Sequence, residues 1–185
     1  TNGIDDDADG LVDLNDTTDC ACPDAGADQW LGNGSFEEMD CCPFTYSELD
    51  CATSWVQPTA ATTDFFHSCN YFPEWIPTPL PGDGLGCAGG YETGNYQEFL
   101  GTRLIQPLLA GHVYTIRMHV AAVLADDQQL VITQPIDFGA TEVTVFGFAD
   151  TTFYLPNYSC PAQMGSLPIG SGTYQPANAW QTLQF

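Results

Sequence analysis

The amino-acid sequence predicts an all-β protein built as a β-sandwich with long irregular loops. Segments rich in β-branched and aromatic residues are short and are separated by Gly and Pro turns, and no stretch shows a helical pattern with caps. A chain of 185 residues that is 44% hydrophobic can bury one core of sandwich size. Strands at this spacing, joined by such turns, are typical of a sandwich.

Two parts of the chain differ sharply in composition, which predicts a small element at residues 1–28 and a β-sandwich domain at 29–185. Residues 1–28 hold nine aspartates and no aromatic residue, so this element cannot fold by burial alone. Residues 39–95 are dense in Cys, Pro, Gly and aromatic residues with little periodicity. We expect them to form irregular structure that is stapled by disulfides rather than by strand ladders.

The clearest strand signals come later in the chain. Residues 112–123 mix β-branched and aromatic residues after a Pro-Leu-Leu-Ala-Gly turn. Further strands are expected at 129–133, 135–139 and 142–149. The final residues, 178–185, also have the composition of a strand and carry no stop signal, so we expect the native polypeptide to continue beyond Phe185.

The aspartates near the start of the chain follow a regular spacing. Counting from Asp5, carboxylates stand at positions one, three, five, nine and twelve, with Gly10 at six and a backbone carbonyl at seven. Alternating carboxylates converge on one hard cation in this way, and the glycine permits the sharp turn. A solvated acidic tail would require neither a glycine at position six nor carboxylates in this order. The sequence therefore predicts a structural Ca²⁺ site with the ligands Asp5, Asp7, Asp9, Leu11, Asp13 and Asp16.

Neither flank of this loop offers the helices of an EF-hand. The stretch "NGIDDDADGLVDLND", followed by Asp19-Cys20, resembles the calcium-wrapped thrombospondin type 3 repeats and similar modules of secreted bacterial proteins. It departs from them where Ala8 replaces a common glycine and Leu14 a common cysteine. At position twelve, Asp16 is shorter than the usual glutamate, so the loop must close more tightly.

The charge of the chain restricts its partners. It carries 24 acidic residues against two basic ones, Arg103 and Arg117, for a formal net charge of −22. Nucleic acid and anionic membrane surfaces would repel such a protein. No apolar run reaches the ~18 residues of a membrane span. The balance suits a medium rich in divalent cations, and halophilic adaptation is an alternative cause. No signal peptide is visible, and the chain starts at Thr1 as though already processed or taken from something longer.

The cysteines are even in number and include no Cys-x-x-Cys pair of a zinc or redox motif. With the absence of lysine, this favours disulfides in an oxidising, extracellular setting, with buried free thiols as the alternative. Cys41 and Cys42 are adjacent, and strain disfavours a bond between them. Each is expected to reach elsewhere, with Cys51, Cys69 and Cys87 as nearby candidates. The full set of disulfide candidates is Cys20, Cys22, Cys41, Cys42, Cys51, Cys69, Cys87 and Cys160.

A series of short landmarks carries a resemblance to a known family. "NGSFEE" at 33–38 looks like the first strand of many carbohydrate-binding jelly rolls, and Cys42-Pro43, Trp55, "DFFHSC" at 64–69, "AGGY" at 88–91, "YQEF" at 96–99 and "PLLAGHVY" at 107–114 follow in order. Together they resemble the extracellular jelly-roll modules of Bacteroidota surface proteins. The resemblance implies a jelly-roll-like β-sandwich, secretion to the cell surface and no demonstrated enzyme activity.

Two Asp-Thr-Thr triplets look like the O-glycosylation signal of that phylum, with Thr17 and Thr151 as the modified residues. So short a signal also occurs by chance. Three N-x-Ser/Thr sequons begin at Asn15, Asn33 and Asn157, but a bacterial source makes N-glycans less expected.

No catalytic motif stands out. The histidines, His67, His112 and His119, are scattered, and no nucleophile elbow, zinc-protease motif or phosphate-binding glycine loop occurs. Glutamates could pair as glycosidase carboxylates, although surface carboxylates are the commoner case; the candidates are Glu37, Glu38, Glu92 and Glu98. Glu37 or Glu38 could also serve a second structural calcium, as the jelly-roll likeness permits.

Aromatic side chains are plentiful between residues 30 and 96 and could stack on sugar rings or contact a neighbouring subunit. The alternative is that they build the core. The candidates for a glycan or subunit contact are Trp55, Trp75 and Tyr91.

From these observations we expect a secreted, non-enzymatic, calcium-stabilised structural or adhesive protein of the cell surface, as a subunit of an extracellular fibre. Its expected partners are like subunits or an extracellular matrix or glycan. The alternative is a carbohydrate-binding module of a larger secreted enzyme.

Overall fold

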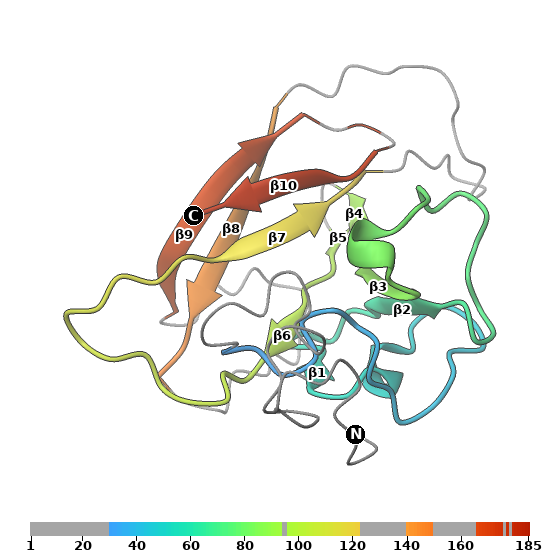
Figure 1. The fold of residues 1–185 in the computed structure, drawn as a ribbon, viewed down its shortest axis with the longest axis horizontal. Coiled ribbons are helices and arrows are strands. Elements are labelled where there is room, and N and C mark those ends of the chain that lie inside the picture. The colour runs from blue at the N-terminus through green and yellow to red at the C-terminus, as the bar shows by residue number, and fades with distance from the viewer. Residues whose placement is uncertain (1–29, 94–95, 123–139, 150–165, 176, 178) are drawn as a thin grey trace, which may run out of the picture.

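The computed structural model describes residues 30–93, 96–122, 140–149, 166–175, 177 and 179–185. Their regular structure is almost entirely strand, which confirms the all-β prediction (Figure 1). Helix within these residues is limited to two short 3₁₀ turns, η2 (Leu49–Cys51) and η3 (Pro81–Asp83). No helix in the described part of the chain is long and apolar enough to cross a membrane.

Every ladder among the described strands is antiparallel and joins two strands. The pairs are β1 (Trp55–Val56) with β6 (Gly101–Thr102), β2 (Asp64–His67) with β3 (Gly86–Gly89), β4 (Glu92–Thr93) with β5 (Tyr96–Gln97), β7 (Arg117–Val120) with β10 (Gln181–Gln184), and β8 (Thr141–Gly147) with β9 (Leu167–Tyr174). The jelly-roll arrangement of these pairs stays a prediction.

Three of the expected strands lie among the described residues. β8 begins one residue before the strand expected at 142–149. β10 lies inside the strand expected at 178–185. β7 is shorter than the expected 112–123, since it begins only at Arg117. The expected strands at 129–133 and 135–139 lie outside the described residues, as does the whole of the predicted 1–28 element.

Two glycines of β9 allow the C-terminal strands to lie close together. A Cβ atom at Gly170 would stand 2.7 Å from Cβ of Phe185, and one at Gly172 would stand 2.5 Å from Cε1 of the same ring. Because both positions lack a side chain, the Phe185 ring lies against β9. Phe185 also exchanges two backbone hydrogen bonds with Ile116, which extends the β7–β10 ladder.

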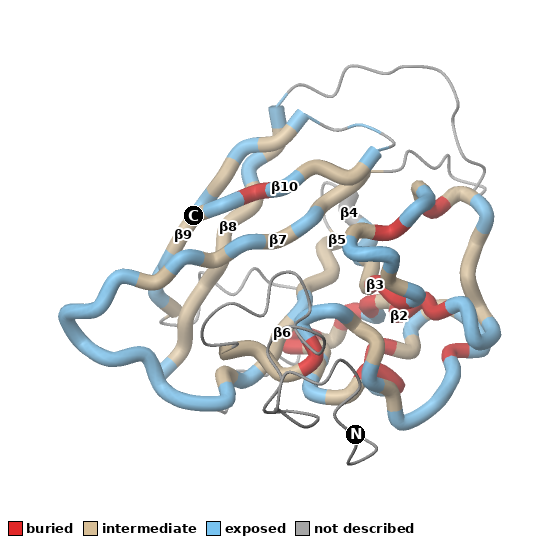
Figure 2. The backbone as a smooth tube through the Cα atoms, in the orientation of Figure 1, coloured by how far each residue is buried: buried red, intermediate tan, exposed pale blue. Residues whose placement is uncertain are grey.

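The core is built around β2. Successive strand residues point to opposite faces, and Phe65 and Phe66 are both buried and belong to different hydrophobic clusters. Phe65 packs with Leu49, Cys51 and Ala52, and Phe66 packs with Ile76, Leu80 and Cys87. Most buried residues therefore lie around β2 and β3, whereas β10 carries a single buried position in the β7–β10 region (Figure 2).

This location partly corrects the expectation for residues 39–95. Much of the region is irregular and carries two disulfides, as expected, but it also holds the β2–β3 ladder and both core clusters. Aromatic and aliphatic side chains from the loops supply the burial that long strands would otherwise provide. Residues 39–95 therefore contain both core clusters and both of these disulfides.

The first strand expected at residues 33–38 is wrong. Asn33 and Phe36 both have positive φ, 55° and 64°, and Phe36 N–H donates to the Asn33 carbonyl at 3.2 Å, so the segment is a turn. The Asn33 side chain takes the place of a strand partner, because its Nδ2 donates to the Glu38 carbonyl at 2.7 Å and its Oδ1 accepts from Glu38 N–H at 2.9 Å. Asparagine tolerates this left-handed conformation better than most residues do.

Candidate functional site

The predicted calcium loop, Asp5 to Asp16, lies outside the described residues, as do Thr17, Thr151, Cys20, Cys22 and Cys160. Their assigned roles stay predictions. Within the described part of the chain, no group of three or more His, Cys, Asp or Glu side chains is arranged to hold a metal ion.

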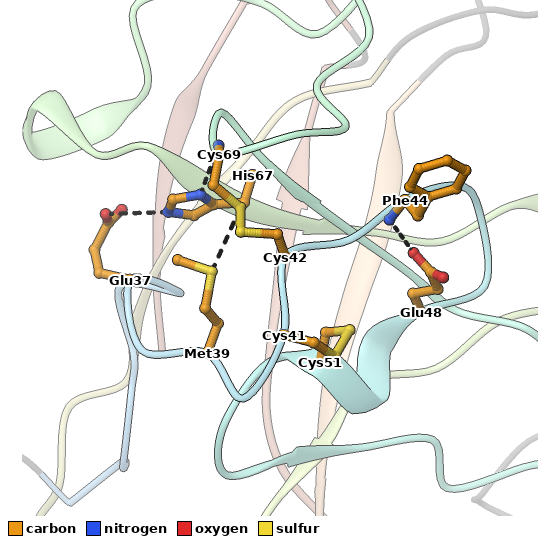
Figure 3. The surroundings of a disulfide bond; sticks show 9 residues. All are labelled: Glu37, Met39, Cys41, Cys42, Phe44, Glu48, Cys51, His67 and Cys69. Carbon is orange, nitrogen blue, oxygen red and sulfur yellow. Dashed lines mark hydrogen bonds and ion pairs between the residues drawn. A yellow bond between two sulfur atoms is a disulfide. The ribbon is translucent and has the colours of Figure 1, made fainter.

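The adjacent cysteines bond in different directions. Cys41 pairs with Cys51, with 4.9 Å between their Cα atoms, and Cys42 pairs with Cys69, with 5.9 Å between theirs (Figure 3). Both Cys42 and Cys69 are exposed, whereas Cys51 is buried in the Phe65 cluster. The two bonds tie the segment before η2 to the core on one side and to the turn after β2 on the other.

Cys87 was a candidate partner for Cys41 or Cys42, and that pairing is wrong. Its thiol is buried in the Phe66 cluster and forms no disulfide with another described cysteine. Burial raises the pKa of this thiol to about 12. Cys87 is therefore an unreactive core residue in the described structure, since the thiolate is the reactive form.

His67, at the end of β2, lies between Glu37 and Cys69 (Figure 3). Its Nδ1 accepts a hydrogen bond from Cys69 N–H at 3.0 Å. The hydrogen of a neutral ring is then on Nε2, which stands 3.7 Å from Oε2 of Glu37. The side chain is 6% exposed, so this histidine joins two loops from within the fold.

Glu37 acts as a backbone acceptor. Its Oε1 accepts from Leu85 N–H at 2.7 Å and from Gly86 N–H at 3.1 Å, and its Oε2 faces His67. N–H donors occupy the positions that a cation would need, which argues against Glu37 as a ligand of a second calcium. The same contacts link the turn after Asn33 to β3.

The sulfur atoms of this region also pack together. Sδ of Met39 lies 3.6 Å from Sγ of Cys69. A disulfide sulfur carries no hydrogen, so this is a van der Waals contact. Figure 3 shows Met39 beside the Cys42–Cys69 bond.

A second polar cluster joins Thr62, two residues before β2, to β5 and the segment that follows it. Oε1 of Glu98 accepts from Oγ1 of Thr62 at 2.9 Å and from the Tyr96 hydroxyl at 2.8 Å. Oε2 of Glu98 accepts from Tyr91 N–H at 2.7 Å. With a further bond from Thr62 N–H to Oε1 at 3.3 Å, four donors satisfy this carboxylate, which fits a structural role in linking loops better than a glycosidase acid.

Asp64 is the most perturbed carboxyl group of this region. Burial raises its pKa from 3.8 to about 6; the hydrogen bond from Ser47 N–H, 2.6 Å long, opposes the rise, and the negative charge of Glu98 adds to it. Asp64 can therefore take up a proton in mildly acidic solution. Sequence reasoning missed Asp64 and Thr62 as parts of this polar cluster. The signal for the cluster in the sequence was the i, i+2 spacing of Tyr96 and Glu98, which puts both side chains on one strand face.

The remaining glutamates and histidines are not brought together. Glu38 is exposed, and the side chain of Glu92 lies outside the described part of the chain. His112 lies in an exposed turn, and His119 on β7 contacts Oγ1 of Thr182 through Nδ1 at 3.0 Å. The described residues therefore place the three histidines in three separate surroundings.

The aromatic candidates divide into two groups. Trp55 stacks on Phe36 with 4.5 Å between ring centroids, and its Nε1 donates to the Asn33 carbonyl at 2.8 Å. Trp75 packs edge-to-face on Phe66 at 5.4 Å. Both tryptophans thus serve the core. Tyr91 is 48% exposed and is the candidate of the three that presents a substantial surface to solvent.

An exposed apolar segment is a further feature that sequence reasoning did not single out. All residues from 105 to 113 are exposed, and they include Ile105, Leu108, Leu109 and Val113. Exposed apolar patches of this kind are typical of interaction sites. Sequence reasoning assigned part of this stretch to a turn and part to a strand.

No protein-family model matches the chain, and no curated protein or solved structure shows significant similarity to it. The resemblance to Bacteroidota jelly-roll modules and to thrombospondin type 3 repeats therefore stays a prediction from the sequence.

Proposed function

We propose that this protein is a secreted, non-enzymatic structural or adhesive component of a cell surface, stabilised by calcium and able to act as a subunit of an extracellular fibre. The observation that carries the proposal is the placement of the apolar side chains. Trp55 and Trp75 pack against the two buried clusters, whereas the segment 105–113, with its apolar side chains Ile105, Leu108, Leu109 and Val113, faces solvent.

Two further features support this proposal. The disulfides Cys41–Cys51 and Cys42–Cys69 fix the irregular part of the fold, and bonds of this kind persist in an oxidising medium. The carboxylates of Glu37 and Glu98 accept several hydrogen bonds each, so they tie loops together. Calcium at Asp5 to Asp16 would neutralise the most acidic segment and let it form a defined contact element.

The carbohydrate-binding module remains the second candidate, favoured by Tyr91. Its ring is half exposed and its backbone is fixed by Glu98, so it could stack on a sugar face. A glycan array with the full chain decides between the two candidates. The structural proposal predicts no saturable binding; saturable binding that is lost in Tyr91→Ala would favour the module.

The calcium part of the proposal has its own test. Isothermal titration of the full chain with Ca²⁺ is expected to show one tight site per chain. Asp9→Asn should weaken it at least about tenfold, because each ligand carboxylate contributes charge and geometry. Asp28→Asn, an aspartate outside the proposed loop, is the matched control and should leave the affinity unchanged. Equal binding by Asp9→Asn and the original chain would contradict the site.

A further inference from the structure

The apolar segment 105–113 is a formed and anchored protrusion. Ile105, Leu109 and Val113 are 67%, 56% and 97% exposed. Its turn is defined, since His112 N–H donates to the Leu109 carbonyl at 3.3 Å and Gly111 has a φ of 82°. Leu109 N–H donates to the Tyr114 hydroxyl at 2.7 Å, and the Tyr114 ring packs edge-to-face on Trp30 at 5.0 Å. Because the backbone of the segment is already ordered, it would lose little conformational entropy when its apolar side chains bind a partner.

The charge of this part of the chain is opposite to that of the remainder. No acidic residue occurs from Phe99 to Ala125, yet both arginines of the protein, Arg103 and Arg117, lie there. Arg103 is exposed and makes no ion pair with another described residue. In a chain with a net charge of −22, this region is the one that an acidic surface would attract.

A surface with the complementary properties exists on the same chain, at residues 40–50. Phe44 is 77% exposed, and the segment also carries two exposed aspartates, Asp40 four residues before it and Asp50 six residues after it. Oε2 of Glu48 accepts from the backbone N–H groups of Phe44 and Thr45, and the two disulfides hold the flanks. The aromatic ring is thus presented on a fixed backbone, in a segment whose two ends carry the exposed carboxylates of Asp40 and Asp50.

The two surfaces lie toward opposite ends of the long axis of the molecule. Residues 105–113 form the left-hand end in Figure 1, and residues 40–47, drawn in blue, lie toward the right-hand side. A contact between two different surfaces of one chain is heterologous, and when its rotation does not close it generates an open chain of subunits.

We propose that the apolar segment 105–113 of one copy docks on the Phe44 surface, residues 40–50, of a second copy, so that subunits add head to tail. Apolar side chains of the segment would pack on the Phe44 ring, and Arg103 would face the carboxylates of Asp40 and Asp50. The inference rests on the proposed structural function and names its partner surface.

Sedimentation velocity of the full chain in calcium, over a range of concentrations, tests the inference. Leu109→Ser/Val113→Ser removes one surface and Phe44→Ser the other, and each should weaken association at least about tenfold, as expected for buried apolar anchors. Val56→Ser, at an exposed apolar position outside both surfaces, is the matched control and should change association less than about twofold. Unchanged thermal unfolding shows that each variant is folded.

A mixing experiment makes the test specific. The Leu109→Ser/Val113→Ser chain keeps an intact Phe44 surface, and the Phe44→Ser chain keeps an intact segment 105–113. Head-to-tail docking therefore predicts that each variant alone is monomeric and that their equimolar mixture stops at dimers. Variants that assemble like the original chain would overturn this interface and leave the structural function standing. An original chain that stays monomeric at every concentration would overturn both.

Discussion

Removal of the Cys42–Cys69 disulfide is the perturbation whose size can be worked out most directly. The bond closes a loop across a sequence separation of 27, and chain entropy then gives it about 3.5 kcal/mol of stabilisation. Cys41–Cys51, with a separation of 10, gives about 2.7 kcal/mol by the same reasoning. The double variant Cys42→Ser/Cys69→Ser should therefore lower the free energy of unfolding by about 3.5 kcal/mol, because both residues are exposed and serine leaves no buried polar group.

Urea unfolding followed by tryptophan fluorescence measures this loss. With a slope of about 2 kcal/mol per molar urea, the midpoint should fall by about 1.5–2 M. Met39→Leu, which changes the side chain against the same sulfur and keeps the bond, is the matched control. It should cost less than about 1.5 kcal/mol. A Cys42→Ser/Cys69→Ser midpoint equal to that of the original chain would refute the role of this bond in holding the core region.

Three further predictions follow from the described contacts. In graded dithiothreitol with alkylation and mass spectrometry, Cys42–Cys69 should open before Cys41–Cys51, because Cys51 is buried; simultaneous labelling would contradict this. The folded-state pKa of Asp64, about 6, lies above its ordinary 3.8, so the stability that this group contributes is fully present below about pH 4 and is lost as the pH rises through 6. Asp64→Asn should consequently raise the free energy of unfolding at pH 7.5 by about 1–2 kcal/mol after allowance for solvent screening. An increase of equal size at pH 3.5 would count against a raised pKa for Asp64. Gly86→Ala places a Cβ atom 2.3 Å from the Phe36 carbonyl oxygen and should destabilise the fold by about 1–3 kcal/mol in the same urea assay, whereas unchanged stability would show that the Asn33 turn does not pack on β3 as described.

The strands with regular alternation were predictable from the sequence. β8 follows from the β-branched residues at 143–145, and the divergence of Cys41 and Cys42 follows from the strain of a bond between neighbours. Both predictions depend on local chemistry, which a sequence displays directly.

Features that depend on distant partners were not predictable. Asn33 forms a turn because its amide pairs with Glu38 and Thr53, and Trp55 is partly buried because Phe36 lies against it. Thr62 and Glu98 meet across 36 positions of sequence. An aromatic or carboxylate side chain looks the same in a sequence whether it faces solvent or the interior, so its role follows only from packing.

We propose that this protein is a calcium-dependent structural subunit that assembles end to end, and electron microscopy of the purified native material with and without a chelator observes both properties at once. We expect assemblies with repeated end-to-end contacts in calcium that disperse when calcium is removed. Isolated particles in both conditions, or assemblies indifferent to the chelator, would contradict it.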